Sequence, residues 1–246
     1  MNINVAQWIG KRGDQEDAYA HRHYPEGTLA VVCDGMGGHD CGSLAASTAA
    51  NAFVEAFDTV EGDTIPARLR AALDKANDAV GELFKKRTSY GGTTLLAVYF
   101  GGGVMWWVSV GDSPLLIWRF GRLMRKNDDH SMRSIYGSYV SSGVMGLEEA
   151  MSQGHSLRSA VTGEKIPIVN NPATPEPLLP GDRIILASDG VDELLLPDLM
   201  LPEVRPETRQ LLDARDGNLA AGIVEACKAL ELPTADNVTV LTLDWQ

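Results

Sequence analysis

The sequence has 246 residues, of which 44% are hydrophobic and 22% charged, a composition typical of a globular protein with a sizeable core. Its formal charge of −12 argues against nucleic acid or an anionic membrane surface as the main partner. No apolar run approaches the ~18–20 residues that cross a bilayer, the N-terminal stretch does not resemble a signal peptide, and the three cysteines form no paired motif. We therefore expect a soluble, cytoplasmic protein.

The first half of the chain alternates between strand and helix patterns. Strands are predicted at 4–9, 18–23 and 29–33, helices at 42–57 and 65–86, and a meander of strands at 93–100, 104–110 and 115–119. The connections within the meander are too short for crossovers, so its strands should pair antiparallel.

The second half is less regular at first. Residues 127–181 predict a short helical insertion and an extended loop, and after them we expect a strand at 183–187, a helix at 219–230 and a closing strand at 238–243. Strands in runs with helices grouped between them indicate an α+β fold.

Four aspartates lie at the ends of predicted core strands: Asp34, Asp112, Asp189 and Asp236. One such aspartate is usually a turn residue. Four of them at converging strand ends would repel, because two unit charges 4 Å apart cost roughly 4 kcal/mol at an effective dielectric of 20. Oxygen-binding divalent cations such as Mg²⁺ or Mn²⁺ would relieve that repulsion, so the pattern predicts a metal site.

Two flanking segments add to this site. The run RGDQED at 12–17 brings a guanidinium, which can hold two oxygens of a phosphate, and further carboxylates, although a surface salt-bridge cluster is the alternative interpretation. The glycine-rich run DGMGGH at 34–39 favours a tight turn in which a backbone carbonyl reaches a metal.

These residues resemble the bacterial metal-dependent protein serine/threonine phosphatases of type 2C. The resemblance spans nearly the whole chain in order and rests on RGDQED at 12–17, VCDGMGGH at 32–39, GGTT at 91–94, VGDS at 110–113, DDHS at 128–131, LASDGV at 186–191 and ADNVT at 235–239. It implies a four-layer α-β-β-α sandwich of two antiparallel sheets flanked by helical pairs, forming one catalytic domain over 1–246 with a flap-like insertion around 132–170.

The resemblance also implies roles for single residues. Asp34 would bridge two tightly bound Mn²⁺ or Mg²⁺ ions, the Gly35 carbonyl would bind one of them, and Asp189 and Asp236 would bind the other. A weaker third ion would lie near Asp112 and Asp189. The remaining residues implied are Arg12 for the substrate phosphate, Asp17 and Glu16 acting largely through metal-bound waters, and Asn237 bracing Asp236.

The activity implied is hydrolysis of phosphoserine and phosphothreonine by in-line attack of a metal-bridging hydroxide. The partner would be a phosphoprotein, the product of a serine/threonine kinase, and the enzyme would be a monomer. Two departures from the family pattern stand out: Pro114 replaces an arginine, and Met36 replaces the histidine that some members use as an acid, with His39 as a possible substitute.

Competing functions are disfavoured by what the sequence lacks. It has no GxxxxGK[ST] loop for a nucleotide-binding P-loop and no cysteine–arginine phosphatase loop. The alternative that remains is a pseudophosphatase that binds a phosphoprotein without turnover, and the intact set of aspartates argues against it.

Overall fold

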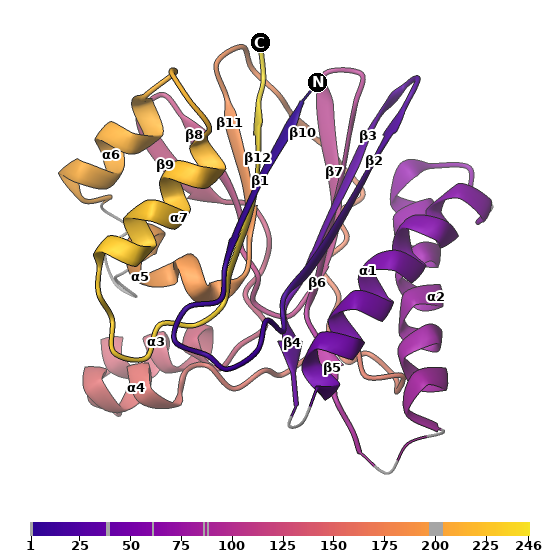
Figure 1. Ribbon diagram of the computed structural model, residues 1–246, viewed down its shortest axis with the longest axis horizontal. Helices are drawn as coiled ribbons and strands as arrows, with labels where there is room; N and C mark the ends of the chain where they lie inside the picture. Colours follow the sequence, from indigo (N-terminus) through magenta and orange to yellow (C-terminus); the bar gives the residue numbers. More distant parts are fainter. Residues whose placement is uncertain (1, 38–39, 61, 86, 88, 197–203) are drawn as a thin grey trace.

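The computed structural model describes residues 2–37, 40–60, 62–85, 87, 89–196 and 204–246, with the backbone alone described at 134, 151 and 152. Within these residues two five-stranded antiparallel sheets face each other and carry helices on their outer sides (Figure 1). The predicted α+β sandwich is therefore confirmed. No helix of the described residues has the length and apolar character needed to span a bilayer.

The first sheet contains both ends of the chain. Its strands are, in spatial order, β1 (Ile3–Trp8), β12 (Val238–Asp244), β11 (Arg183–Ala187), β8 (Leu115–Arg119) and β9 (Arg122–Arg125). Its outer face is covered by α5 (Asp192–Leu195), α6 (Pro206–Asp213) and α7 (Leu219–Ala229) (Figure 1).

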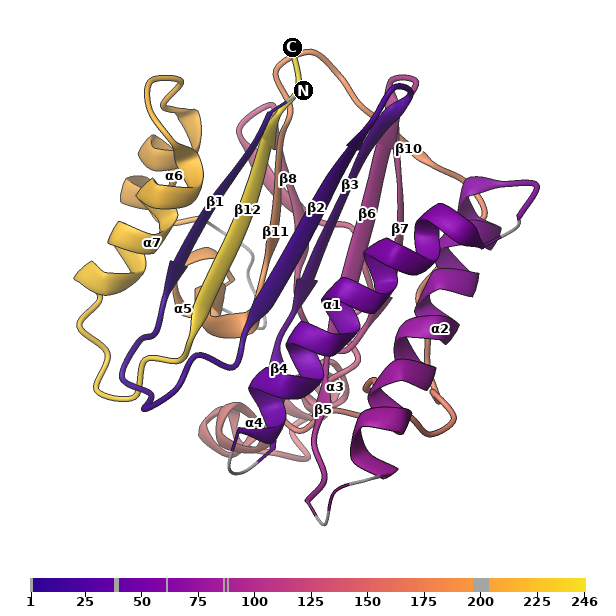
Figure 2. The ribbon, with the colours of Figure 1, turned by 45° about the vertical axis from the view of Figure 1, so that its right-hand side comes forward.

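The second sheet is built from the first half of the chain. Its strands are, in spatial order, β10 (Glu176–Pro177), β7 (Val104–Val110), β6 (Leu95–Gly101), β3 (Gly27–Cys33) and β2 (Ala18–Tyr24). Two long helices, α1 (Cys41–Thr59) and α2 (Ile65–Lys85), cover its outer face, as Figure 2 shows.

The strand β3 explains how the layers are held together. Alternate side chains of a strand point to opposite faces. Val31 and Cys33 pack against the helices, whereas Ala30 and Val32 pack between the sheets against residues such as Leu186. Because both faces are buried, the strand is almost entirely apolar, and Asp34, which follows its last residue, enters the cleft at a fixed position.

The topology brings several strand ends to one end of the sandwich. β3 and β7 both pair antiparallel with β6, so their C-terminal ends lie on the same side. β11 pairs antiparallel with β12, so the end of β11 adjoins the start of β12. The lower end of the molecule in Figure 1 thus collects the aspartates that follow or precede these strands.

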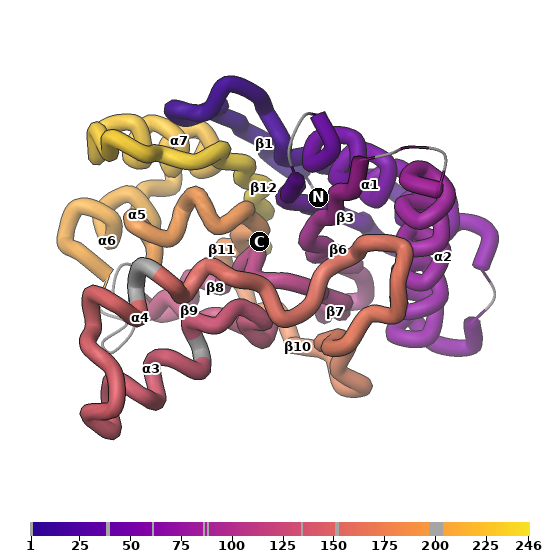
Figure 3. The backbone as a smooth tube through the Cα atoms, turned by 90° about the horizontal axis from the view of Figure 1, so that it is seen from below, coloured from indigo at the N-terminus to yellow at the C-terminus, as the bar shows by residue number. Residues whose placement is uncertain are grey.

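A small substructure borders this same end. Helices α3 (Arg133–Ser141) and α4 (Leu147–Gln153) lie beside it, and the chain then crosses below the sheets toward β10 (Figure 3). A short pair, β4 (Gly35–Met36) and β5 (Gly92–Thr93), lies opposite, and Thr93 pairs with Val161 of the crossing segment.

Candidate active site

The strand-end aspartates surround one cleft of about 470 Å³. Its lining includes Asp34, Asp112, Asp189 and Asp236, together with Arg12. The structure therefore brings together the four carboxylates that the sequence predicts to converge. Glu16, Gly35 and Asn237 line the same cleft.

Asp34 is fixed by its backbone. Its N–H donates to Thr94 Oγ1 at 2.9 Å, and its carbonyl accepts from the Thr94 N–H at 2.8 Å and from Thr93 Oγ1 at 2.9 Å. Burial, followed by repulsion from Asp17 and Asp189, raises the pKa of this carboxyl well above its usual range. The backbone thus holds this carboxyl in a buried position next to other carboxylates, where a negative charge is unfavourable.

Asp17 lies close enough to Asp34 to raise the pKa of that carboxyl, and it is itself almost fully buried. Its Oδ2 accepts a hydrogen bond from Ser188 Oγ at 2.7 Å, whereas Oδ1 has no hydrogen-bond partner in the described part of the chain. Burial raises the pKa of Asp17 to about 7. A buried carboxylate oxygen without a partner is costly and is suited to a cation or an ordered water.

Gly35 lies where no larger residue fits. A Cβ at this position would lie 2.3 Å from the Gly42 carbonyl oxygen and 2.5 Å from that of Glu16. The Gly35 N–H also donates to the Glu16 carbonyl at 3.2 Å. Close packing of the 16–17 backbone against β4 and the start of α1 therefore requires glycine here.

Asp236 is paired with Arg12. The guanidinium Nη2 lies 2.5 Å from Asp236 Oδ2, and both side chains are partly exposed. Asp236 Oδ1 accepts the backbone N–H of Asn237 at 2.8 Å. The hydrogen bond with Asp236 raises the pKa of Arg12, so the arginine keeps its charge at the edge of the cleft.

The side chain of Asn237 braces a loop. Its Oδ1 accepts the Glu16 N–H at 2.7 Å, and its Nδ2 donates to the carbonyls of Ile9 at 2.8 Å and Asp14 at 3.0 Å. Asn237 therefore ties the loop that carries Arg12 to the start of β12, and it reaches Asp236 only through its backbone. Burial raises the pKa of Glu16, which lies on this loop.

Asp112 and Asp189 meet on the other side of the cleft. Burial raises the pKa of both, and repulsion from Asp189 raises that of Asp112 further. Arg125 of β9 donates to the Asp112 carbonyl at 2.6 Å. A guanidinium from the neighbouring strand thus supports the turn that contains Pro114.

Three polar residues of this region were not singled out in the sequence. His155 lines the cleft and lies close enough to Asp189 to lower the pKa of that carboxyl. Arg133 pairs with Asp192, whose Oδ1 has no partner in the described residues and whose pKa burial raises to about 7. His155 and Arg133 belong to the irregular 127–181 segment, where no periodic pattern marked them.

The oxygen atoms that line the cleft are of the chemical type that hard divalent cations prefer as ligands. The charged donors are carboxylate oxygens, their repulsion is reflected in the raised pKa values, and Asp17 offers a buried oxygen without a partner. No three Asp, Glu, His or Cys side chains of the described residues are already arranged as ligands of one ion. A carbonyl such as that of Gly35, and release of Asp236 from Arg12, would be needed to complete a site. His39 lies outside the described residues.

The known proteins to which this chain is similar are protein phosphatases. A sequence model described as Protein phosphatase 2C matches residues 11–225. The serine/threonine protein phosphatase PstP of Mycobacterium tuberculosis is 30% identical over 243 residues, which cover 95% of this chain but 42% of PstP. The chain thus spans less than half the length of this relative. A putative protein phosphatase 2C-type of Streptococcus pyogenes is 27% identical over 207 residues, covering 80% of this chain and 82% of that protein.

Solved structures share the architecture. The PPM Ser-Thr phosphatase MsPP from Mycobacterium smegmatis, in complex with cacodylate, superposes with a TM-score of 0.74 at 27% identity, over 100% of this chain and 99% of MsPP. The catalytic domain of PstP in complex with two manganese ions superposes with a TM-score of 0.76 at 28% identity, over 99% and 97% of the two chains. The chain belongs to the protein phosphatase 2C family.

Proposed function

We propose that this chain hydrolyses phosphoserine and phosphothreonine in proteins and depends on Mn²⁺ or Mg²⁺. The observation that carries the proposal is the convergence of four aspartates with Arg12 in one cleft, with the buried Asp17 next to them. Such a group of like charges needs cations, and an arginine beside it provides a grip for a phosphate.

We assign the residues as follows. Asp34 and the Gly35 carbonyl would contact the tightly bound ions together with Asp17, Asp189 and Asp236, with Glu16 and Asn237 in support, and Asp112 would join Asp189 around a weaker third ion. The catalytic set is Arg12, Asp34, Asp189 and Asp236. PstP, whose structure contains two manganese ions, supports the two-ion part of this assignment.

The chain's own groups position the substrate. When bound, the ions would activate water and neutralise charge on the phosphoryl group for in-line attack. Arg12 would hold two phosphate oxygens, and Asn237 would keep the Arg12 loop against β12 so that the guanidinium stays over the carboxylates.

We further propose that residues 1–246 form one catalytic domain, with the insertion around 132–170 as a flap beside the cleft. The substrates would be phosphoproteins made by a serine/threonine kinase, and the enzyme would act as a cytoplasmic monomer. The relatives named serine/threonine phosphatases support the substrate class.

The direct test uses purified protein with p-nitrophenyl phosphate and a phosphothreonine peptide. Hydrolysis of both with Mn²⁺, abolished by EDTA and restored by added Mn²⁺, is the expected result, and Asp34→Asn should abolish turnover. Tight binding of the phosphopeptide without any release of phosphate would instead identify a pseudophosphatase.

A further inference from the structure

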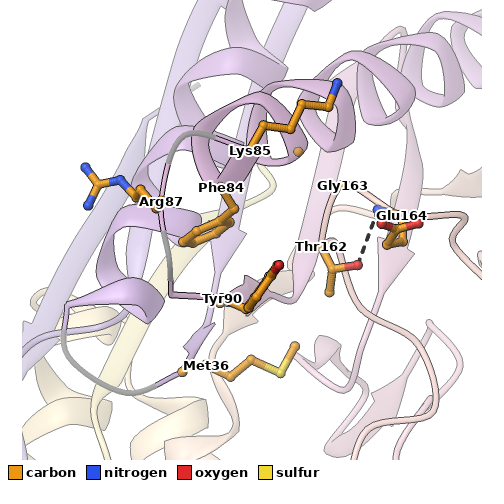
Figure 4. A pocket seen from close by; sticks show the side chains of 12 residues that line it. Met36, Phe84, Lys85, Arg87, Tyr90, Thr162, Gly163 and Glu164 are labelled. Atoms are coloured by element: carbon orange, nitrogen blue, oxygen red, sulfur yellow. Dashed lines mark hydrogen bonds between the residues drawn. The ribbon is translucent and has the colours of Figure 1, made fainter.

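A second pocket, of about 650 Å³, lies beside the cleft and has no role in the proposed chemistry. Its walls come from the C-terminal end of α2, the residues before β5, β4 and the segment around Thr162 (Figure 4). The side chains of Phe84, Tyr90 and Met36 project into this space in Figure 4. Two aromatic side chains and one thioether thus form the apolar part of the lining, between glycines and polar residues.

The pocket adjoins the catalytic cleft. Met36 and Gly37 line both. Met36 follows Asp34 by two positions, which at about 3.3 Å per strand residue places the shared wall roughly 7 Å from that aspartate. An extended chain covers this distance in two to three residues.

The wall opposite Phe84 is firmly held. Asn77 of α2 accepts the N–H of Gly163 through Oδ1 at 3.0 Å and donates through Nδ2 to the Glu164 carbonyl at 2.9 Å. A Cβ on Gly163 would lie 2.2 Å from the Gly81 Cα, so the segment packs directly on the helix backbone. This wall of the pocket is thus preformed, which favours binding because little order has to be imposed on it.

The lining selects an apolar, uncharged group. Tyr90 is 82% exposed, so a side chain placed against it would remove a large aromatic surface from water. The charges at the rim are mixed: Lys85 is paired with Glu82 at 2.5 Å, and Arg87 and Glu164 also line the pocket. Because both signs of charge are present, the rim has no single sign of charge to offer a charged group.

We propose that this pocket is a specificity subsite for the substrate chain, taking a Leu, Ile, Met or Phe side chain two or three residues from the phosphorylated residue. The proposal rests on the proposed phosphatase function, because the cleft must hold the phosphate that anchors the peptide. The substrate chain is the occupant that fits, because Met36 and Gly37 form a wall shared by this pocket and the cleft that would hold the phosphate.

The test compares phosphothreonine peptides that differ at one position. An otherwise alanine-rich peptide receives a single Leu two or three residues before or after the phosphothreonine, and kcat/KM is measured with Mn²⁺. One Leu peptide should exceed the Ala peptide by about tenfold, a ratio typical of one apolar group filling a pocket. In Tyr90→Ala, which opens the pocket, and Thr162→Trp, which fills it, the Leu-to-Ala ratio should fall toward one.

The matched control is Phe120→Ala. Phe120 is 84% exposed, like Tyr90, but lies at the end of β8 away from Asp112. This variant should keep the wild-type ratio. A wild-type ratio of one at every position, or a Leu preference that survives in both pocket variants, would overturn the subsite.

The two proposals fail in different ways. Absence of p-nitrophenyl phosphate hydrolysis by the wild type would refute the enzymatic function alone. In that case the dissociation constants of the same fluorescent phosphopeptides, measured by anisotropy, replace the kinetics. The subsite predicts the same Leu preference and its loss in Tyr90→Ala and Thr162→Trp, and equal dissociation constants for all peptides would refute it.

Discussion

The metal-free protein should lose stability as the pH rises, and Asp17 is the residue that best exposes this effect. Burial raises its pKa from 3.8 in the unfolded chain to about 7 in the folded one. Between these values the folded state holds a proton that the unfolded state has released. The free energy of unfolding therefore falls as the pH rises through this window.

The size of the effect follows from the two pKa values. At 1.36 kcal/mol per pKa unit, Asp17 alone would lower the free energy of unfolding by up to about 4 kcal/mol between pH 4 and pH 8. Asp34, Asp112 and Asp189 have pKa values raised for the same reason, so their contributions have the same sign.

The perturbation is Asp17→Asn, which keeps the shape of the side chain and removes its charge. The free energy of unfolding, measured with urea in EDTA at pH 5, 6, 7 and 8, should decline clearly less with rising pH in this variant than in the wild type. Asp14→Asn, at an exposed position of the same loop, is the matched control and should keep the wild-type decline. Because the amide can leave a buried N–H unpaired, the slope with pH is the diagnostic quantity, and the absolute stability is not.

The same titration with saturating Mn²⁺ supplies the second half of the test. If cations bind the carboxylates, the wild-type decline should shrink, because the ions favour the ionised form. A wild-type stability that stays flat or rises between pH 5 and pH 8 in EDTA would refute the reasoning. An unchanged slope in Asp17→Asn would show that this residue is not its source.

Three further predictions concern the rest of the cleft. Arg12→Ala should raise KM, measured by kinetics, and slightly tighten Mn²⁺ binding, measured by calorimetry. The gain in Mn²⁺ affinity should be less than about fivefold, because the exposed ion pair with Asp236 is worth about 0–1 kcal/mol. Weaker Mn²⁺ binding would contradict the idea that Arg12 and Mn²⁺ compete for Asp236. Asp112→Ala should keep two tight ions but slow phosphopeptide hydrolysis more than that of p-nitrophenyl phosphate, whose leaving group needs little protonation; an equal loss on both substrates would argue against the third-ion role. Asn237→Ala should lower the free energy of unfolding, measured by chemical denaturation, by about 1–3 kcal/mol, because the loop that carries Arg12 loses its hydrogen bonds to the Asn237 side chain. KM should rise for the same reason. An unchanged KM would show that the position of this loop does not affect substrate binding.

Much of the fold could be predicted because its elements are long and strongly periodic. The apolar run of β3 and the helical spacing in α1 and α2 gave the correct types within a few residues. The short elements were not predicted. β4 and β5 have two residues each, too few for any period, and β9 carries arginines at both ends in place of an alternating apolar pattern.

The site, too, has residues whose positions the sequence predicts and contacts that it does not. The positions of Asp34, Asp112 and Asp189 followed from their place directly after apolar strands. The pairing of Arg12 with Asp236 joins residues 224 apart in the sequence and depends on a loop fixed by Asn237, so no local pattern could reveal it. His155 reaches the cleft from a segment whose course is set by tertiary contacts and not by its own periodicity.

The burial of β3 on both faces has a consequence for the mechanics of the cleft. Asp34 follows a strand clamped between a helical layer and a second sheet, so it cannot swing away from its neighbours without disturbing two cores. The repulsion among the aspartates therefore cannot be relaxed by movement of this strand and is relieved only by protons or cations. The packing of the sandwich therefore sets the distances between the carboxylates. Substitutions of core residues beneath the cleft should change which divalent ion binds best, even though every carboxylate is kept.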